Sequence, residues 1–90
     1  MRKATLNGKR MINREVAHAY LKRKLGFPDY YGRNLDALWD LLTTIHEPLE
    51  IRIFNRDSIL EKMGEYGERL LSTLDEASEE NPRITLKYCN

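Results

Sequence analysis

The sequence has few of the residues that form disulfides or metal sites, and it has no long apolar run. Its one cysteine, Cys89, cannot form an internal disulfide bond, so nothing points to an oxidising compartment. His18 and His46 are too far from each other and from Cys89 in sequence to show metal-ligand spacing. No apolar run reaches the roughly 18 residues of a membrane span, and no apolar segment follows the basic N-terminus as in a signal peptide. We therefore expect a cytoplasmic protein with no membrane segment, no metal and no other cofactor.

The composition is that of a small soluble globular protein. The chain has 90 residues, of which 41% are hydrophobic and 32% charged, and we expect one domain spanning residues 1–90. The net charge of +1 hides an asymmetry. Residues 1–28 carry eight Lys or Arg and one Glu, whereas residues 29–50 carry one Arg and five Asp or Glu. The middle of the chain is therefore locally acidic within a balanced protein.

Hydrophobic periodicity predicts a chain in which strands alternate with pairs of helices. Alternation with period two indicates strands at residues 3–7, 49–53 and 83–89. Helical spacing indicates helices at residues 13–25, 34–45 and 67–80, and a short one between residues 55 and 64. Strands joined by helical crossovers pair in parallel, and alternation in all three strands leaves one sheet face more exposed. We therefore expect an α/β fold, a three-stranded parallel sheet with about four helices packed mainly on one face.

Local signals refine the first and third of these helices. Asn13 is expected to cap the first helix, because its side-chain oxygen can accept from a free backbone N–H of the first turn. Val16 is expected to point inward, and His18 is expected to be a surface or edge residue. The short third helix is expected to be capped by Asn55 or Asp57.

The stretch of residues 28–43 predicts a loop that runs directly into the second helix. Pro28 ends the preceding segment, and Gly32 is expected to supply a turn conformation closed to other residues. Asn34 is a good N-cap for the apolar run that follows. The apolar residues of that run recur at helical spacing and predict one buried stripe, formed by Leu35, Leu38, Leu42 and Ile45.

The second face of this helix carries two carboxylates that do not favour the helix. Asp36 and Asp40 are four residues apart, and like charges at this spacing repel by about 0.2–0.5 kcal/mol. No Lys or Arg occurs between Ala37 and Glu47 to compensate them. One explanation is an ordinary solvated face in which Arg33 pairs with Asp36. The other is a surface selected for an external partner, and the aromatic neighbours of the carboxylates favour this interpretation.

The same stretch resembles the signature of the barstar family, small bacterial inhibitors of secreted ribonucleases of the barnase type. The matching residues are Pro28, Tyr30-Tyr31-Gly32, Asn34-Leu35-Asp36-Ala37-Leu38-Trp39-Asp40, Leu42 and Thr43. Weaker agreement extends towards both ends, at Asn7-Gly8, Pro48-Leu49, Glu76-Ala77 and Ile84-Thr85. The resemblance implies the same parallel-sheet fold. It also implies a protein that is a monomer when free and forms a one-to-one complex with an extracellular barnase-type ribonuclease.

The resemblance also assigns roles to individual residues. It implies that Asp40 enters the ribonuclease active site and meets its phosphate-binding cations, with Asp36 beside it. It implies that Tyr30 packs on an active-site histidine and that Glu76 makes a peripheral ion pair, while Tyr31 either contacts the partner or packs behind the loop. The remaining residues expected in or beside the interface are Gly32, Asn34, Trp39 and Thr43.

Two residues in the expected interface depart from the family pattern. Arg33 stands where the type member has an acid, which places a cation in the loop of residues 28–33, called the binding loop below. Such a cation would repel a basic ribonuclease or fit a different one. Thr44 replaces a glycine at the end of the helix. We include both residues in the expected partner-binding surface.

Three other functions compete with ribonuclease inhibition. Asp36 and Asp40 could form an acid–base pair, but a convex helix in so small a domain offers no cleft for a substrate, so we expect no enzyme. An immunity or interaction protein of the same fold could bind a different toxin or a non-nuclease partner. A weaker alternative is RNA binding without sequence specificity through the basic residues of the first helix region, Lys9, Arg10, Arg14, Lys22, Arg23 and Lys24.

Overall fold

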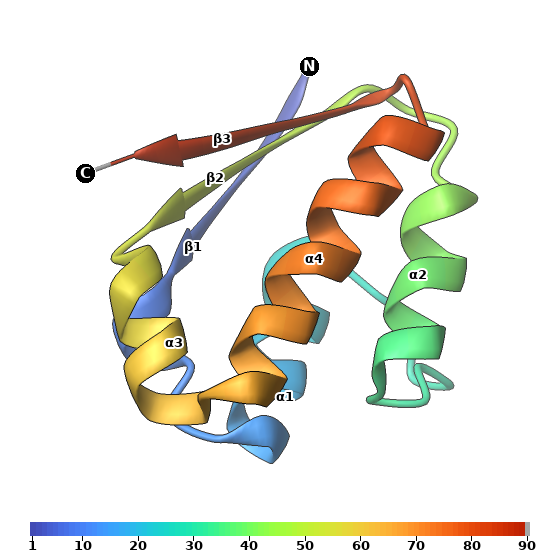
Figure 1. The fold of residues 1–90 in the computed structure, drawn as a ribbon. Coiled ribbons are helices and arrows are strands. Elements are labelled where there is room, and N and C mark those ends of the chain that lie inside the picture. The colour runs from blue at the N-terminus through green and yellow to red at the C-terminus, as the bar shows by residue number, and fades with distance from the viewer. Residues whose placement is uncertain (90) are drawn as a thin grey trace.

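Three parallel strands lie side by side in the order β1, β2, β3 in the computed structural model, which describes residues 1–89 (Figure 1). The strands are β1 (Arg2–Asn7), β2 (Leu49–Phe54) and β3 (Ile84–Cys89). In the register of the sheet, Ile51 of the central strand lies opposite Ala4 of β1 and Leu86 of β3. The predicted three-stranded parallel sheet is confirmed.

The helices lie together on one side of this sheet (Figure 1). They are α1 (Arg14–Leu25), α2 (Leu35–Thr43), α3 (Arg56–Met63) and α4 (Glu65–Glu80), and a short 3-10 helix, η1 (Gly8–Arg10), follows β1. The predicted order of elements is confirmed, with η1 as an addition. Among residues 1–89, no helix is both long and apolar enough to cross a membrane.

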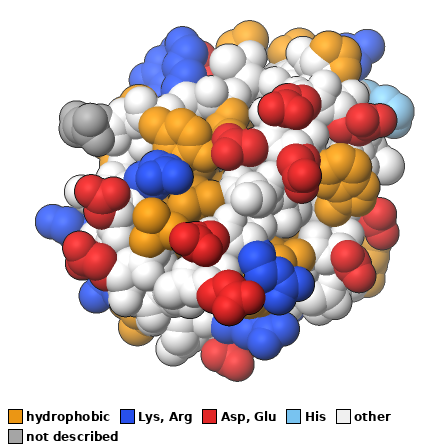
Figure 2. Space-filling model, viewed as in Figure 1, with side chains coloured by type: hydrophobic (Ala, Val, Ile, Leu, Met, Phe, Trp, Pro, Cys, Tyr) orange, Lys and Arg blue, Asp and Glu red, His pale blue; other side chains and the backbone are white. Residues whose placement is uncertain are grey.

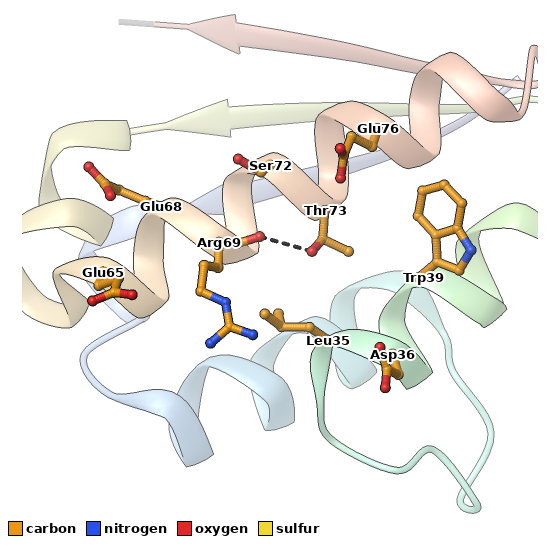
Figure 3. A pocket seen from close by; sticks show the side chains of 9 residues that line it. All are labelled: Leu35, Asp36, Trp39, Glu65, Glu68, Arg69, Ser72, Thr73 and Glu76. Carbon is orange, nitrogen blue, oxygen red and sulfur yellow. Dashed lines mark hydrogen bonds between the residues drawn. The ribbon is translucent and has the colours of Figure 1, made fainter.

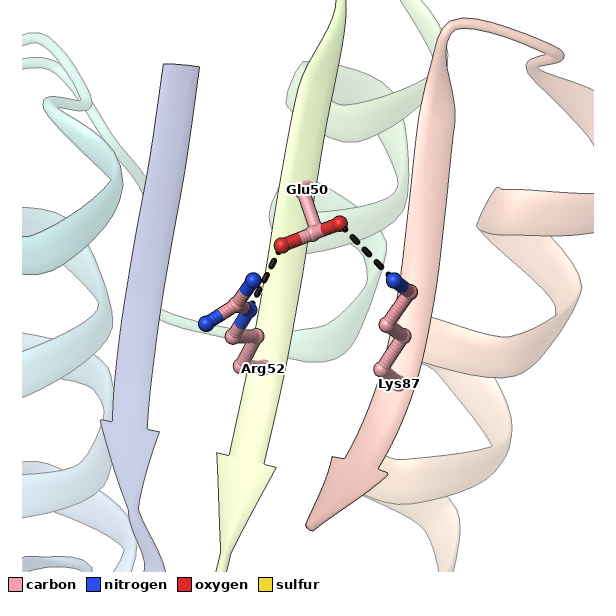
Figure 4. Close-up of polar contacts among 3 residues, drawn as sticks. All are labelled: Glu50, Arg52 and Lys87. Carbon is pink, nitrogen blue, oxygen red and sulfur yellow. Dashed lines mark hydrogen bonds and ion pairs between the residues drawn. The ribbon is translucent and has the colours of Figure 1, made fainter. Parts of the chain in front are cut away.

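Alternation along the strands separates a buried face from an exposed face. Leu49, Ile51 and Ile53 of β2 are at most 1% exposed, and by alternation they point to the helical layer. Glu50 lies between them on the opposite face, where its carboxylate contacts Arg52 Nε at 2.6 Å and Lys87 Nζ at 3.2 Å (Figure 4). The hydrogen bond from Arg52, followed by that from Lys87, holds the pKa of Glu50 below its usual range. On the face of the sheet without helices, Glu50 is therefore paired with two cations.

Two predicted N-caps are present at the helices that frame the binding loop. Asn13 Oδ1 accepts the Val16 N–H of α1 at 2.9 Å, and Asn34 Oδ1 accepts the Ala37 N–H of α2 at 2.8 Å. Both caps are local interactions, formed with a residue three positions along the chain. The residues themselves therefore determine where α1 and α2 begin.

The predicted cap of α3 is wrong. Asn55 precedes α3 in a left-handed conformation, with φ of 55°, and its side chain makes no capping hydrogen bond. Its amide instead donates to Asn7 Oδ1 at 2.8 Å, joining the loop after β2 to the end of β1. Asp57 lies inside the first turn of the helix. A contact between distant parts of the chain has replaced the local cap.

The inward face of α1 differs from the prediction at Val16, whereas the inward positions expected for Tyr20, Leu21 and Leu25 are confirmed. Val16 is 38% exposed, so the expectation that it points inward is wrong. Ala17, Leu21 and Leu25 form the buried face, each at most 2% exposed. The expectation of a surface position for His18 is wrong as well, because its side chain is 0% exposed.

The buried His18 joins three parts of the fold through two hydrogen bonds. Its Nδ1 lies 2.6 Å from the Tyr31 hydroxyl in the binding loop, and its Nε2 lies 2.6 Å from the Tyr66 hydroxyl at the start of α4. A neutral imidazole has one donor and one acceptor nitrogen, so one hydroxyl donates to the ring and the other accepts from it. Removal from water lowers the pKa of His18, and the charges of Arg14 and Arg33 lower it further. The neutral ring therefore ties the binding loop to α1 and α4.

A second buried side chain, Asn81, connects the end of α4 with the end of α2. Its amide donates to the carbonyl oxygens of Leu42 at 2.9 Å and Ile45 at 3.1 Å, and its Oδ1 accepts from the Arg83 N–H at 3.0 Å. The carbonyl groups at a helix C-terminus lack partners within the helix. The Asn81 side chain supplies these partners from outside the helix. The helix α2 ends at Thr43, whereas the prediction placed its end near Ile45.

The first prediction concerns acidification. Because the folded-state pKa of His18 is below the 6.5 of the free side chain, the unfolded chain binds more protons. The free energy of unfolding should therefore fall as the pH drops below about 6.5 towards the folded-state pKa, by up to about 1.4 kcal/mol per pH unit. Urea unfolding between pH 7.5 and 5.5 measures this slope. The variant His18→Gln should reduce the slope of the free energy of unfolding against pH, and the control His46→Gln should not. A slope that persists in His18→Gln would contradict its assignment to His18.

The second prediction concerns Asn81. Asn81→Leu removes three hydrogen bonds from a buried position and should lower the free energy of unfolding by about 2–3 kcal/mol in urea denaturation. Hydrogen exchange should accelerate most in the last turn of α2. The control Ser78→Ala removes only a hydrogen bond to the Asp75 carbonyl within α4, so it should cost less. Equal stability of the Asn81→Leu variant and the wild type would show that Asn81 does not hold α2.

Candidate protein-binding site

The packing of α2 determines which of its side chains face outward. Leu38 and Leu42 are 0% exposed and fix the inner face of the helix, as the predicted stripe requires. Leu35 and Ile45, the other two members of that stripe, are partly buried against the core. Asp36 and Asp40 therefore lie on the outer surface, where both are exposed.

Neither carboxylate has a cation of its own. Within residues 1–89, the ion pairs are Lys22 with Asp29 and Glu50 with Arg52 and Lys87. The pair between Arg33 and Asp36, the alternative that would have made this an ordinary solvated face, is not formed. Both charges on α2 remain available to an external cation.

Asp36 lines a groove between α2 and α4 (Figure 3). The groove has a volume of about 540 Å³ and is lined on the α2 side by Asp36 and Trp39 and on the α4 side by Glu76 and Arg69, among others. Thr73 in its wall is satisfied within α4, since its hydroxyl donates to the Arg69 carbonyl at 2.8 Å. The groove thus brings Asp36, Trp39 and Glu76 together from two helices.

Asp40 lies one turn further along the same outer face of α2 and lines a second hollow, next to the binding loop. It shares a hollow with Tyr30 and Gly32, and the Tyr30 side chain is 82% exposed. An exposed ring beside an unpaired carboxylate provides flat contact area next to a charge. The predicted residues therefore line two hollows at the outer face of α2, with Asp40 and Tyr30 in one and Asp36, Trp39 and Glu76 in the other.

Figure 2 shows the face formed by α3, α4 and α2. Asp and Glu side chains are spread over this face, and Lys and Arg side chains lie among them and gather near its lower edge. The acidic surface thus extends beyond α2 itself.

The residue of the binding loop with a left-handed backbone conformation is Arg33. The prediction that Gly32 supplies this turn is therefore wrong. Arg33 has φ of 54°, in the left-handed region, where an L residue costs about 1–2 kcal/mol, whereas Gly32 lies outside that region. Space at Gly32 is limited, because a Cβ there would lie 3.2 Å from the Ala37 Cβ, and the neighbour would have to move by a few tenths of an ångström. The Asn34 amide donates to the Gly32 carbonyl at 3.3 Å and helps to hold the turn.

An ion pair holds the start of the loop to α1. Lys22 Nζ lies 2.9 Å from Asp29 Oδ1. The hydrogen bond and the positive charge of Lys22 lower the pKa of Asp29. The loop is thus attached at Asp29 on the surface and at Tyr31 in the interior.

Three of the predicted interface residues have structural roles. Tyr31 is 4% exposed, so it packs behind the loop, the second of the two roles expected for it. Thr43 Oγ1 donates to the Trp39 carbonyl at 2.8 Å, and Thr44 Oγ1 donates to the Asp40 carbonyl at 3.0 Å. The two hydroxyls supply partners for the last turn of α2.

The sequence did not reveal the interior residues that fix the loop and the end of α2, which are His18, Tyr66 and Asn81. One signal was available for His18, because it precedes Leu21 by three residues and Leu25 by seven, and so belongs to their helical face. No local pattern marks Tyr66 or Asn81. Among residues 1–89, no group of three or more His, Cys, Asp or Glu side chains is placed to hold a metal ion.

Comparison with known proteins identifies the family of this chain. Residues 1–88 match the family model described as Barstar (barnase inhibitor). The chain is also similar to a Bacillus subtilis (strain 168) protein named "Putative ribonuclease inhibitor YrdF", with 47% identity over 81 residues, which is 89% of each chain. The family match extends over nearly the whole described sequence, including the loop, α2 and Glu76 of α4. This chain therefore belongs to the barstar family.

Proposed function

We propose that this protein inhibits a secreted barnase-type ribonuclease by placing the Asp40 carboxylate in the enzyme's phosphate-binding site. The observation that carries the proposal is the pair of exposed, unpaired carboxylates on α2, Asp36 and Asp40. The family description as barnase inhibitor and the relative's name as a ribonuclease inhibitor support the same class of partner.

The chemistry of the two surfaces is complementary. A ribonuclease site holds phosphate with Arg, Lys and His side chains, and a carboxylate can accept the same charge-assisted hydrogen bonds, often two at a time from one Arg. Asp36 would meet cations at the edge of that site from within the α2–α4 groove. Tyr30 would lay its exposed ring against the enzyme's aromatic or imidazole groups.

The fixed position of α2 supports tight binding. Its N-terminus is capped by Asn34, its C-terminus is held by Asn81, and the preceding loop is fixed by Tyr31 against His18. A binding surface that is already ordered loses little conformational entropy when it docks. Inhibition would therefore be reversible, one-to-one and strong without a covalent step.

The overall charge of the protein makes long-range attraction weak. With a net charge of +1, the chain does not resemble a strongly acidic inhibitor that draws a basic enzyme from a distance. The local acidic surface acts only within a Debye length of about 8 Å at physiological salt. We place the protein in the cytoplasm as a free monomer, where it would protect the cell from its own or a neighbour's ribonuclease.

A second candidate function is that of an immunity protein of the same fold with a different toxin as partner. The exposed cation Arg33 in the binding loop favours it, because a uniformly basic enzyme would repel that charge. A pulldown from native lysate with the immobilised chain, identifying whether the captured protein cleaves RNA, separates the two candidates.

RNA binding is less well supported than protein binding. Several cations of the α1 region already contact neighbouring groups of this chain. Arg14 stacks over the Tyr66 ring at 4.5 Å, Arg23 lies 5.6 Å from the Tyr20 ring centre, and Lys22 pairs with Asp29. An RNA-binding role would predict RNA affinity that falls steeply with salt and is lost on charge reversal at Lys22, Arg23 and Lys24.

The third prediction tests the proposed role of Asp40. The wild-type chain titrated into a barnase-type ribonuclease should abolish RNA cleavage stoichiometrically. Asp40→Ala would leave the enzyme's cations buried without a partner, which costs about 3–5 kcal/mol and should raise the inhibition constant at least a hundredfold. Urea unfolding should show a fold as stable as the wild type, or slightly more so, because a repulsion within α2 is removed.

An exposed acid on another helix, Glu61, provides the matched control for Asp40→Ala. Glu61→Ala removes an exposed acid from α3, away from the α2 surface, and should leave inhibition unchanged. If Asp40→Ala inhibits as well as the wild type, the phosphate-mimicry mechanism is wrong. If the wild type inhibits no barnase-type ribonuclease, the partner is of another kind.

A further inference from the structure

A basic surface lies next to the acidic surface of α2, on the opposite side of the binding loop. Arg33 shares a shallow depression with Lys22 and Arg23 at the C-terminal end of α1, and Phe27 lines the same depression. Arg33 follows directly after Tyr30–Gly32, the loop segment that shares the neighbouring hollow with Asp40. The candidate interface therefore has two signs of charge, negative on α2 and positive beside the loop.

Within this surface, Arg33 is the residue without an evident role in the fold. It is exposed, and no carboxylate of residues 1–89 forms an ion pair with it. Lys22, its neighbour, is already paired with Asp29. Arg33 also holds a left-handed conformation that Gly or Asn would adopt with less strain. Strain and an unused charge at an exposed loop position indicate selection for a contact outside the chain.

The charge of Arg33 also acts on the buried pair beneath the loop. Burial lowers the pKa of His18 and raises the pKa of Tyr31, and the nearby charge of Arg33 acts to lower both. No carboxylate of residues 1–89 pairs with Arg33, so its charge is available to a group of another molecule.

We infer that the protein partner presents an Asp or Glu carboxylate opposite Arg33, and that Arg33 determines which partners this chain accepts. The inference rests on the proposed function, which supplies the partner's cations opposite Asp36 and Asp40. A partner surface with cations facing α2 and a carboxylate facing Arg33 fits in one orientation only. Complementary charge of both signs fixes that orientation and excludes enzymes whose rim is basic at this point.

A protein carboxylate fits this surface better than the phosphates of RNA. Asp29 pairs with Lys22, which lines the same depression as Arg33, and Asp40 lies in the neighbouring hollow. A polyanion running over Arg33 would therefore pass close to these carboxylates. One carboxylate on a folded partner can reach Arg33 without approaching them. The guanidinium group can hold such a carboxylate with two parallel hydrogen bonds, which makes the contact directional.

The test uses a barnase-type ribonuclease that the wild-type chain inhibits, and compares inhibition constants of Arg33 variants. Arg33→Glu should raise the constant about tenfold or more, because like charges then face each other. Arg33→Gly relieves the backbone strain but removes the charge, and should raise the constant about two- to fivefold although the fold becomes more stable. Arg33→Lys should stay nearest to the wild type. Lys3→Glu, which reverses an exposed charge on the sheet face without helices, is the control and should have no effect.

A rescue experiment identifies the facing group. Each Asp and Glu around the active site of the ribonuclease is changed to Lys in turn, and one of these variants should restore tight inhibition by Arg33→Glu. Inhibition by Arg33→Glu that equals or exceeds that of the wild type would overturn the inference, since the partner surface would then be neutral or basic there. A loss that no ribonuclease variant restores would overturn it as well.

The outcomes separate this inference from the proposed function. If Asp40→Ala loses inhibition while Arg33→Glu does not, only the role of Arg33 is wrong. If the wild type inhibits none of the ribonucleases tested, both are wrong. A fluorescein-labelled 20-nucleotide RNA that binds the wild type and is released by Arg33→Glu would assign the basic surface to RNA and overturn the carboxylate partner.

Discussion

The two hydrogen bonds of the buried His18 are the interaction on which the binding surface depends. They connect a loop, the first helix and the last helix through one side chain that has no contact with water. Tyr31 cannot leave its place without exposing the imidazole and breaking a bond in a dry environment, which is costly. The position of the loop, and with it of Tyr30 and Arg33, therefore follows from the interior of the protein. A surface built in this way is ordered before any partner arrives.

The outer face of α2, in contrast to this rigid interior, carries interactions that destabilise the fold. Asp36 and Asp40 weaken the helix that carries them, since they repel each other and no cation of the described chain pairs with them. The buried leucines, the Asn34 cap and the amide of Asn81 offset that loss. Arg33 adds backbone strain of its own. Stability is thus concentrated beneath the site, and unfavourable interactions are concentrated on its surface, as is common in binding sites.

The sequence predicted the features of the fold that depend on neighbouring residues. The caps at Asn13 and Asn34 and the parallel sheet follow from local patterns, and all are present. The misses have a common cause. Asn55 binds a residue 48 positions away instead of capping α3, and His18 finds its partners 13 and 48 positions away. No local pattern contains such pairings. For the site, the exposed carboxylates of α2 were predictable, whereas the positive φ at Arg33 followed from the three-dimensional path of the loop.

The central claim is that a carboxylate of this chain occupies the place of an RNA phosphate in the partner. Competition with a ribonucleoside 3′-monophosphate, used as an active-site ligand of the ribonuclease, tests it most directly. In calorimetric titrations, the apparent dissociation constant of the complex should rise in proportion to nucleotide concentration once the nucleotide saturates the enzyme. An affinity that is unaffected by saturating nucleotide would show that both bind together, and would contradict the account.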